Sequence, residues 1–332
     1  MTTPQIILAK RPEGLPTLDN FKTTTLTLPE PGADEVLLQG LYYSVDPYMR
    51  GRMSSVKSYA PPFETGKAIS GAVVAKVLAS NSPGFSPGDT VTGTMPWQEK
   101  MTMPAKQLRK IDDHTAPSSY YLGILGMTGL TAYFGLLHIG KPKSGETVVV
   151  SGAAGAVGMV VGQLAKLKGC RVVGIAGTDE KIQSLKDAYG FDEAINYKTA
   201  GNIDEVIARA CPDGVDVYFD NVGGPISDAV INHLNFHARV PLCGQISLYN
   251  SKETPMGPRL QPLLLKRSVL MQGFIIGNFQ AEFEAGRKQM ASWVKDGKLK
   301  FRETIVEGFD KLPEAFLDLF SGKNTGKMIV KA

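Results

Sequence analysis

Three glycines, Gly152, Gly155 and Gly158, stand three residues apart, directly after a β-branched run over 148–150. Apolar residues then recur with the period of a helix, at Val157, Val160, Val161, Leu164 and Leu167. This pattern predicts a strand, a tight turn and a helix. In such a turn, small residues let the backbone approach a dinucleotide pyrophosphate, and the helix N-terminus faces its negative charge. The residues therefore indicate nucleotide binding.

The same turn also has a plainer explanation, because glycines let a helix pack closely on a strand. A second strand–helix unit follows, however, with a strand over 171–176 and a helix over 178–189. In NAD sites, a carboxylate about twenty residues beyond the glycine turn accepts a hydrogen bond from the ribose 2′-OH. Here the second strand ends at Gly177 without an acid, and Asp179 and Glu180 come later, in the first helical turn, where acids are common.

Side chains that bind metals are sparse. A catalytic zinc needs three protein ligands and an open position, but residues 1–120 contain no cysteine and only one histidine, His114. His233 and His237 are four residues apart and could share a helix face, yet position 234 is a leucine and no third ligand lies nearby in the sequence. We therefore expect no bound metal and interpret both as ordinary helix-end or core histidines.

The elements that must position these residues change character along the chain. Short apolar runs between proline and glycine turns predict a β-rich barrel or sandwich over residues 1–120, completed by 301–332. Strands alternate with helices over 121–300, which predicts an α/β domain with a parallel sheet and helices on both faces. The expected strands there cover 147–151, 171–176, 215–220, 238–243 and 269–274. The tail should contain a helix over 312–321 and a strand over 327–331.

Composition narrows the class of protein. The chain has 332 residues, a net charge of +4 with dispersed lysines and arginines, and no apolar run long enough to span a bilayer. We therefore expect neither a nucleic-acid partner nor a membrane association, and the N-terminus lacks the features of a secretory signal. Cys170, Cys211 and Cys243 are odd in number and widely spaced, as expected for reduced thiols in a cytoplasmic protein.

Eight motifs occur along the chain: VDPYMRGRM (45–53), LGMTGLTAYFGLL (125–137), AAGAVG (153–158), GTDEK (177–181), NYK (196–198), FDNVGG (219–224), CGQISLYN (243–250) and GKNTGK (322–327). In this order they resemble the zinc-free medium-chain dehydrogenase/reductases of the leukotriene B4 dehydrogenase type. That group includes prostaglandin reductases, plant double-bond reductases and bacterial curcumin reductases. The resemblance covers nearly the full length, and DPYMR together with FDNVGG is far more specific than the glycine turn.

The resemblance implies a GroES-like β-barrel domain, a Rossmann domain with a doubly wound parallel sheet, NADPH as the cofactor, and a homodimer. The implied reaction is zinc-independent reduction of the C=C bond of a small α,β-unsaturated aldehyde or ketone, by hydride transfer to its β-carbon. The chain departs from the pattern at two positions. Lys266 and Ala72 stand where some relatives carry tyrosines, so the substrate preference is not inherited.

The resemblance also implies cofactor contacts. Lys181 and Tyr197 would contact the 2′-phosphate, Cys243 the adenosine, and 274–276 the nicotinamide. Lys181 could equally be a solvated helix residue, while Asn221 and Asn324 stand in sequences that also suit plain turns. The implied contacts are Gly155, Ala156, Val157, Gly158, Gly177, Lys181, Tyr197, Asn221, Cys243, Tyr249, Phe274, Ile275, Ile276 and Asn324.

Tyr249 is the main catalytic candidate. It lies just past the carboxyl end of an expected strand, where ligands bind in open α/β sheets. A tyrosine with an unperturbed pKa near 10 stays protonated at neutral pH and can donate to the oxygen of a developing enolate. Alternatively, Tyr249 holds the cofactor mechanically. Tyr48 of DPYMR is the second candidate, as a wall for the nicotinamide or the substrate, or as part of the barrel packing.

Two other functions share the cofactor arguments. A quinone reductase on the same scaffold would transfer hydride to a quinone ring and would need no proton at an alkene carbon. A non-catalytic NADPH-binding protein would retain the glycine turn without turnover.

Overall fold

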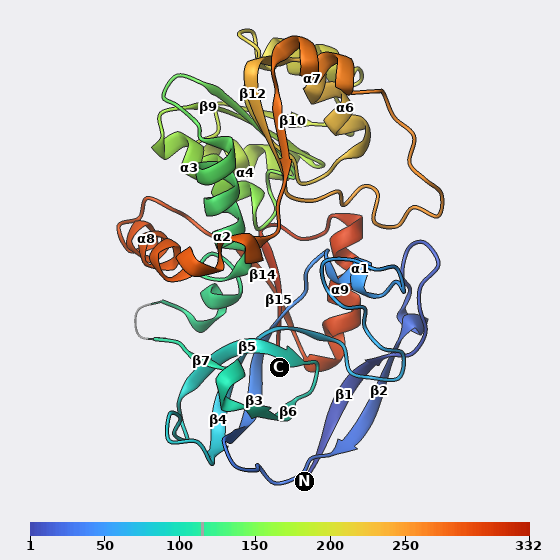
Figure 1. Cartoon of the computed structure of the whole chain (residues 1–332), viewed down its shortest axis with the longest axis vertical. Helices are drawn as coiled ribbons and strands as arrows, with labels where there is room; N and C mark the ends of the chain where they lie inside the picture. The colour runs from blue at the N-terminus through green and yellow to red at the C-terminus, as the bar shows by residue number, and fades with distance from the viewer. Residues whose placement is uncertain (114–115) are drawn as a thin grey trace. The chain divides into compact units, whose positions relative to one another are not determined.

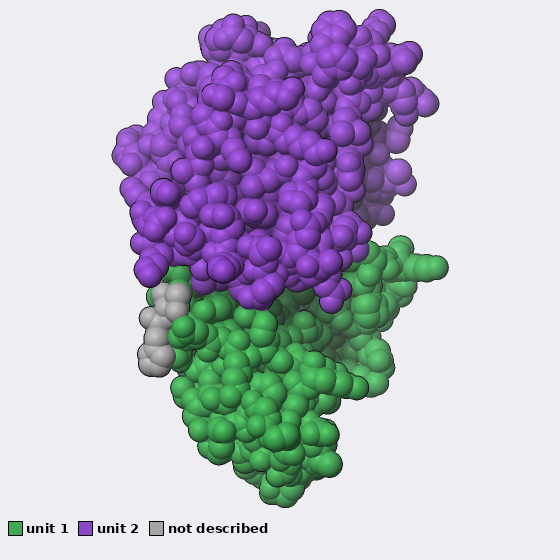
Figure 2. Space-filling model, turned by 60° about the vertical axis from the view of Figure 1, so that its left-hand side comes forward, with its two compact units in different colours: residues 1–123, 303–324, 328–332 green, residues 124–302, 325–327 purple. Residues whose placement is uncertain are grey.

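The computed structural model describes residues 1–113 and 116–332, so His114 lies outside the described residues. The chain forms two compact units, which Figure 1 shows as a ribbon and Figure 2 in two colours. Unit 1 comprises residues 1–123, 303–324 and 328–332, and unit 2 comprises 124–302 and 325–327. Among the described helices, none has both the length and the apolar character needed to cross a membrane.

Unit 1 is built from antiparallel strands, as its short apolar runs and turn residues predict. Its central strand β3 (Glu35–Ser44) pairs with β4 (Ser70–Ser80), β6 (Lys100–Pro104) and β15 (Lys327–Lys331), in a sheet of order β14-β15-β3-β4-β5-β7. The other elements are β1 (Thr2–Leu8), η1 (Leu18–Asn20), β2 (Phe21–Thr27), α1 (Met49–Arg52), β5 (Thr90–Pro96), η2 (Ala105–Gln107), β7 (Arg109–Lys110), η3 (Ser118–Leu122), β14 (Glu303–Glu307), η6 (Phe309–Lys311) and α9 (Leu312–Ser321).

The core of unit 1 joins its strands to the C-terminal helix α9. Leu312, Phe316 and Leu319 are buried on one face of this helix, at the three- and four-residue spacing of an amphipathic helix. The ring of Phe316 meets Phe21 edge-on at 6.1 Å, and Phe21 stacks on Trp97 at 6.4 Å. The helix and strand predicted for the tail are therefore confirmed, with the tail packed against strands from the beginning of the chain.

Unit 2 holds a six-stranded sheet whose order is β10-β9-β8-β11-β12-β13, and its five pairings are all parallel. Renumbered from one, this is the 3-2-1-4-5-6 order of the Rossmann fold. Helices α2, α3 and α4 pack in one group and α5 and α6 in another. The strands are β8 (Thr147–Ser151), β9 (Arg171–Ala176), β10 (Glu193–Asn196), β11 (Val215–Phe219), β12 (Leu234–Leu242) and β13 (Leu270–Gly273). The helices are α2 (Met127–Phe134), η4 (Gly135–Gly140), α3 (Gly158–Leu167), α4 (Asp179–Tyr189), α5 (Ile203–Ala210), α6 (Gly224–Asn232), α7 (Gln261–Arg267), η5 (Ile276–Glu282) and α8 (Phe283–Lys295).

The parallel sheet predicted from the alternating pattern is confirmed, but the expectation for His237 was wrong. His233 and His237 do not share a helix face, because α6 ends at Asn232 and β12 already begins at Leu234. His233 is a helix-end residue as expected, whereas His237 is neither at a helix end nor in the core: it is exposed, with a φ of 60° in β12. The short edge strand β10 was not anticipated.

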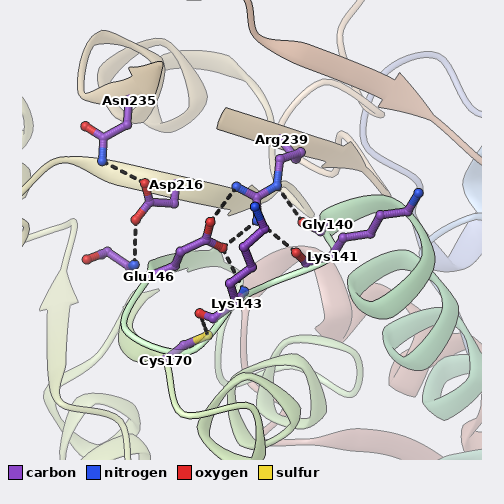
Figure 3. Close-up of polar contacts among 9 residues, drawn as sticks. Gly140, Lys141, Lys143, Glu146, Cys170, Asp216, Asn235 and Arg239 are labelled. Atoms are coloured by element: carbon purple, nitrogen blue, oxygen red, sulfur yellow. Dashed lines mark hydrogen bonds and ion pairs between the residues drawn. The ribbon is translucent and has the colours of Figure 1, made fainter. Parts of the chain in front are cut away.

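Hydrogen bonds and an ion pair connect polar residues at the amino ends of the central strands (Figure 3). Arg239 donates to Glu146 Oε1 at 3.0 Å and to the carbonyl oxygen of Gly140 at 2.8 Å. Burial by itself would raise the pKa of Glu146, but the hydrogen bonds from Arg239 and the Lys143 amide hold it below its ordinary value. Asp216 of β11 accepts from the Thr147 amide at 2.8 Å. Glu146 and Asp216 therefore stabilise the fold, and they lie at the sheet edge opposite the carboxyl ends of the strands.

Candidate active site

The carboxyl ends of all six strands of unit 2 carry residues implied for cofactor binding. Because the strands are parallel, these ends lie on one edge of the sheet, and ligands bind there in open α/β folds. Chain order reverses between the neighbours β8 and β11, which makes their ends the topological switch point. Along the edge, Tyr197 follows β10, Gly177 follows β9, Gly155–Gly158 follow β8, Asn221 follows β11, Cys243 and Tyr249 follow β12, and Phe274–Ile276 follow β13.

The glycine turn after β8 has no room for side chains at two of its positions. Gly152 has a φ of 59°, and a Cβ atom at Gly158 would lie 2.3 Å from the Gly152 carbonyl oxygen. Both positions therefore exclude side chains for reasons of the turn itself. Gly155, Ala156 and Val157 remain partly exposed, and α3 begins immediately afterwards. The turn and this helix N-terminus fit the diphosphate of a dinucleotide.

A second group lies at the ends of β9 and β10, where the 2′-phosphate is expected. A Cβ atom on Gly177 would lie 2.9 Å from the Tyr197 ring and 3.3 Å from Lys198 Cε, so Gly177 leaves room between these side chains. Burial, and then the charge of Lys198, lower the pKa of Lys181. Two lysines therefore share this corner, which suits a dianionic phosphate. Lys198 was not anticipated, although it stands within the NYK motif.

Asp179, the acid near the end of β9, is hydrogen-bonded to another side chain. Asp179 Oδ1 accepts a hydrogen bond of 2.7 Å from the Asn196 side chain, at the end of β10. Thr178 caps α4 by accepting from the Lys181 amide at 3.3 Å. The carboxylate nearest to the end of β9 therefore serves the local structure, in agreement with a site that holds a phosphate rather than a free ribose 2′-OH.

Asn221 joins the two strands at the switch point. Its backbone amide donates to Ser151 Oγ at 2.9 Å, and its side-chain amide donates to the Ser151 carbonyl oxygen at 2.8 Å. Both alternatives considered for Asn221 are thus compatible with the structure, because it builds the turn and also stands at the ligand edge. Cys243 follows β12 on the same edge, and burial raises the pKa of its thiol to about 12.

Tyr249 closes the loop that follows β12. Its hydroxyl oxygen accepts a hydrogen bond of 3.2 Å from the backbone amide of Gln245, which leaves the hydroxyl hydrogen for another acceptor. The expectation of an unperturbed pKa needs correction, because burial raises the pKa of Tyr249 above its ordinary value. The correction strengthens the conclusion that this hydroxyl is protonated at neutral pH.

The end of β13 adds an aromatic contact to this edge. The Phe274 ring meets Phe219 of β11 edge-on, with 6.3 Å between centroids. Ile275 is 40% exposed, and Ile276 begins η5. The segment thus presents apolar side chains at the end of β13, with Phe274 next to Phe219 of β11.

The two remaining candidates belong to unit 1. Tyr48 precedes α1 and packs, partly buried, against the core of that unit, and burial followed by the charge of Asp46 raises its pKa to about 12. The packing alternative for Tyr48 therefore describes part of its environment. Asn324 lies two residues before Gly326, and the amide of Gly326 donates to the Ala154 carbonyl oxygen of the glycine turn at 2.8 Å.

Asp220 is a buried residue that sequence reasoning passed over as part of a turn. It follows β11, is 0% exposed, and accepts a hydrogen bond of 3.0 Å from Ser151 Oγ. A charged residue directly after the apolar run Val217–Phe219 was the available signal. Within residues 1–113 and 116–332, no group of three or more histidine, cysteine or acidic side chains is arranged to hold a metal ion.

Comparison with known proteins identifies relatives over the whole chain. Residues 4–111 match a family model described as the N-terminal domain of oxidoreductases, and residues 156–292 match one described as zinc-binding dehydrogenase. The Bacillus subtilis protein YfmJ, whose name describes an NADP-dependent oxidoreductase, is 60% identical over 98% of this chain and 97% of its own. An NADP⁺-dependent 2-alkenal reductase of Nicotiana tabacum is 42% identical over 98% and 96%. The crystal structure of CurA from Vibrio vulnificus in complex with NADPH has a TM-score of 0.95 and 45% identity, covering 99% of each chain.

Proposed function

Since this chain belongs to the zinc-free medium-chain dehydrogenase/reductases, as an NADP-dependent oxidoreductase of the curcumin, prostaglandin and alkenal reductase group, we propose that it reduces the C=C bond of α,β-unsaturated aldehydes and ketones. One observation carries the proposal. The protonated hydroxyl of Tyr249 lies on the same sheet edge as the glycine turn and the two lysines, Lys181 and Lys198. Its oxygen accepts a hydrogen bond from the backbone amide of Gln245. A proton donor is thus held on the edge where the cofactor binds.

Different groups on this edge have different proposed roles. The amides of the glycine turn and the α3 N-terminus hold the pyrophosphate, while Lys181, Lys198 and Tyr197 hold the 2′-phosphate. Phe274 and its neighbours orient the nicotinamide and keep water from it. We assign cofactor binding to unit 2, and Tyr48 of unit 1 remains a candidate contact of the nicotinamide or the substrate.

NADPH, when bound, supplies the hydride that reaches the β-carbon of the substrate. Tyr249 donates a hydrogen bond to the carbonyl oxygen, on which negative charge develops, and a well-placed donor of this kind contributes about 3–4 kcal/mol. Hydride addition to the β-carbon leaves negative charge on the α-carbon, and conjugation delocalises this charge to the carbonyl oxygen. Solvent or Tyr249 then supplies a proton to the α-carbon, which completes the reduction. The substrate therefore must combine an alkene with a carbonyl group.

Substrate panels test this proposal. We expect NADPH oxidation, in the presence of a metal chelator, with trans-2-nonenal and 3-nonen-2-one, and chromatography should identify the saturated carbonyl products. Nonanal is the matched control, because it has the same length and carbonyl group but no C=C bond. Turnover of 1,4-naphthoquinone alone would instead indicate a quinone reductase. Enhanced NADPH fluorescence without consumption of any acceptor would indicate a non-catalytic binding protein.

We further propose that the chain forms a homodimer. The sheet of unit 2 ends at β13, no described strand pairs with the outer edge of β13, and Leu270 on this strand is 52% exposed. An open edge with apolar side chains is a template for pairing with a second strand. Light scattering should give the mass of two chains, and Leu270→Asp should shift it towards one. A single-chain mass for the unmodified protein would contradict this proposal.

A further inference from the structure

The carboxylate of Asp220 accepts hydrogen bonds from several segments at the carboxyl ends of the strands of unit 2. Its Oδ1 accepts from the Tyr218 hydroxyl at 2.8 Å and the Ser151 hydroxyl at 3.0 Å. The same oxygen accepts from the backbone amides of Val222 and Gly223 at 3.0 and 2.9 Å. These contacts join the end of β8 to the turn that precedes α6.

The second carboxylate oxygen reaches the loop that carries Tyr249. Oδ2 of Asp220 accepts from Ser227 Oγ at 2.9 Å and from Gln245 Nε2 at 3.1 Å. The backbone amide of Gln245 in turn donates to the Tyr249 hydroxyl oxygen. A single residue, Gln245, therefore touches the buried acid with its side chain and the tyrosine with its backbone.

The backbone reinforces this link. The amides of Cys243 and Gly244 both donate to the Asp220 carbonyl oxygen, at 2.9 and 3.1 Å. Gly223 has a φ of 69°, and a Cβ atom there would lie 2.1 Å from Gln245 Oε1. The Gln245 side chain is therefore confined between the turn after β11 and the carboxylate.

The chemistry of these contacts requires an acid. An ionised carboxylate accepts at both oxygens, whereas an asparagine at this position would turn an NH₂ group towards one set of donors. Within the described chain, hydroxyl, amide and backbone groups supply all six of these hydrogen bonds, and neither lysine nor arginine does. Such a fully bonded polar network fixes one arrangement of the segments that meet in it.

We propose that Asp220 is a positioning residue, which fixes the hydroxyl of Tyr249 through Gln245. This inference rests on the proposed role of Tyr249 as proton donor. Asp220 touches no reacting atom, because its two oxygens are used within the protein. Its effect on the reaction is to hold the loop so that the tyrosine oxygen is bonded on one side and its hydrogen points to the substrate.

Turnover measurements test the link. We expect Asp220→Asn to lower kcat by about 10- to 100-fold, since small displacements of a catalytic group have effects of this size, with little change in KM for NADPH. Gln245→Met removes only the connecting donor and should lower kcat in the same direction. Asp216→Asn is the matched control, because Asp216 lies at the opposite end of β11 and binds Thr147 and Asn235. Its kcat should equal that of the unmodified protein.

A double-mutant cycle distinguishes positioning from a general structural effect. In the Tyr249→Phe background, Asp220→Asn and Gln245→Met should cause little further loss of kcat, because the group that they position is gone. Equal losses with and without the Tyr249 hydroxyl would overturn the inference. Should Asp220→Asn fail to fold, Gln245→Met alone completes the cycle.

Carbon-13 NMR of tyrosine-labelled protein provides a readout independent of activity. The Tyr249 ring signal is the one absent from the Tyr249→Phe spectrum. It should shift in Gln245→Met and Asp220→Asn but remain in place in Asp216→Asn. An unshifted signal in the first two variants overturns the positioning role at any level of activity. A shifted signal combined with unchanged turnover of Tyr249→Phe sustains positioning and refutes the proposed donor.

Discussion

Replacement of Tyr249 by phenylalanine is expected to lower kcat for enals and enones by about 10- to 10³-fold, the range found when one donor to a developing oxyanion is removed. The ring and its packing are retained, so the affinity for NADPH, measured by fluorescence titration, should change little. The hydroxyl is part-buried and its pKa is raised. The donor should therefore remain protonated across the neutral pH range.

Tyr189→Phe is the matched control for this experiment. Tyr189 ends α4 and is buried, and burial likewise raises its pKa, but it belongs to no part of the proposed site. Removal of the Tyr189 hydroxyl should leave kcat unchanged. Unchanged turnover in Tyr249→Phe as well would show that the tyrosine only supports the cofactor, and that another group donates to the enolate oxygen.

Lys181→Ala is expected to reduce the preference for NADPH over NADH by about 10- to 150-fold, measured as the ratio of the two kcat/KM values. A charge-assisted hydrogen bond of this kind contributes about 1.5–3 kcal/mol. NADH lacks the 2′-phosphate, so its kcat/KM should be almost unaffected. Equal losses for both cofactors would remove Lys181 from the phosphate site.

A neighbouring lysine on the same helix supplies the control. Lys186 forms an ion pair with Glu193 at 2.9 Å, so Lys186→Ala should leave the cofactor preference unchanged.

The pKa of Lys181 also predicts how the preference for NADPH depends on pH. Burial and Lys198 lower this pKa, so the positive charge is lost at a lower pH than for an ordinary lysine. NADPH preference should therefore decline as pH rises through the lowered pKa, and this decline should be absent in Lys181→Ala.

The strands and helices with strong apolar periodicity could be predicted closely from the sequence. The run over 147–151, the strand over 171–176 and the helix over 312–321 coincide with β8, β9 and α9. These segments are buried on the faces that their patterns define, so local preference and tertiary packing agree. The strand β10 escaped prediction because it has only four residues, of which only Ile195 is buried.

The contacts of the site were less accessible to sequence reasoning. Lys198 reaches Lys181 only because β10 lies beside β9, although the two residues are 17 positions apart. Asp220 has the appearance of a turn residue in the sequence. Five of the six donors to its carboxylate lie outside β11, and two of them, Ser151 and Gln245, are 69 and 25 positions away along the chain. Such donors meet only after the sheet has formed.

By itself, the sequence determined that glycines form a tight turn between a strand and a helix, that strands alternate with helices, and that Tyr249 follows a strand. These features depend on local backbone preferences and on periodic burial, which neighbouring residues specify. Only the tertiary structure decided that the ends of six strands share one edge and that a buried aspartate connects two of their loops. Strand order and long-range hydrogen bonds depend on how separate segments pair, and no local pattern records that pairing.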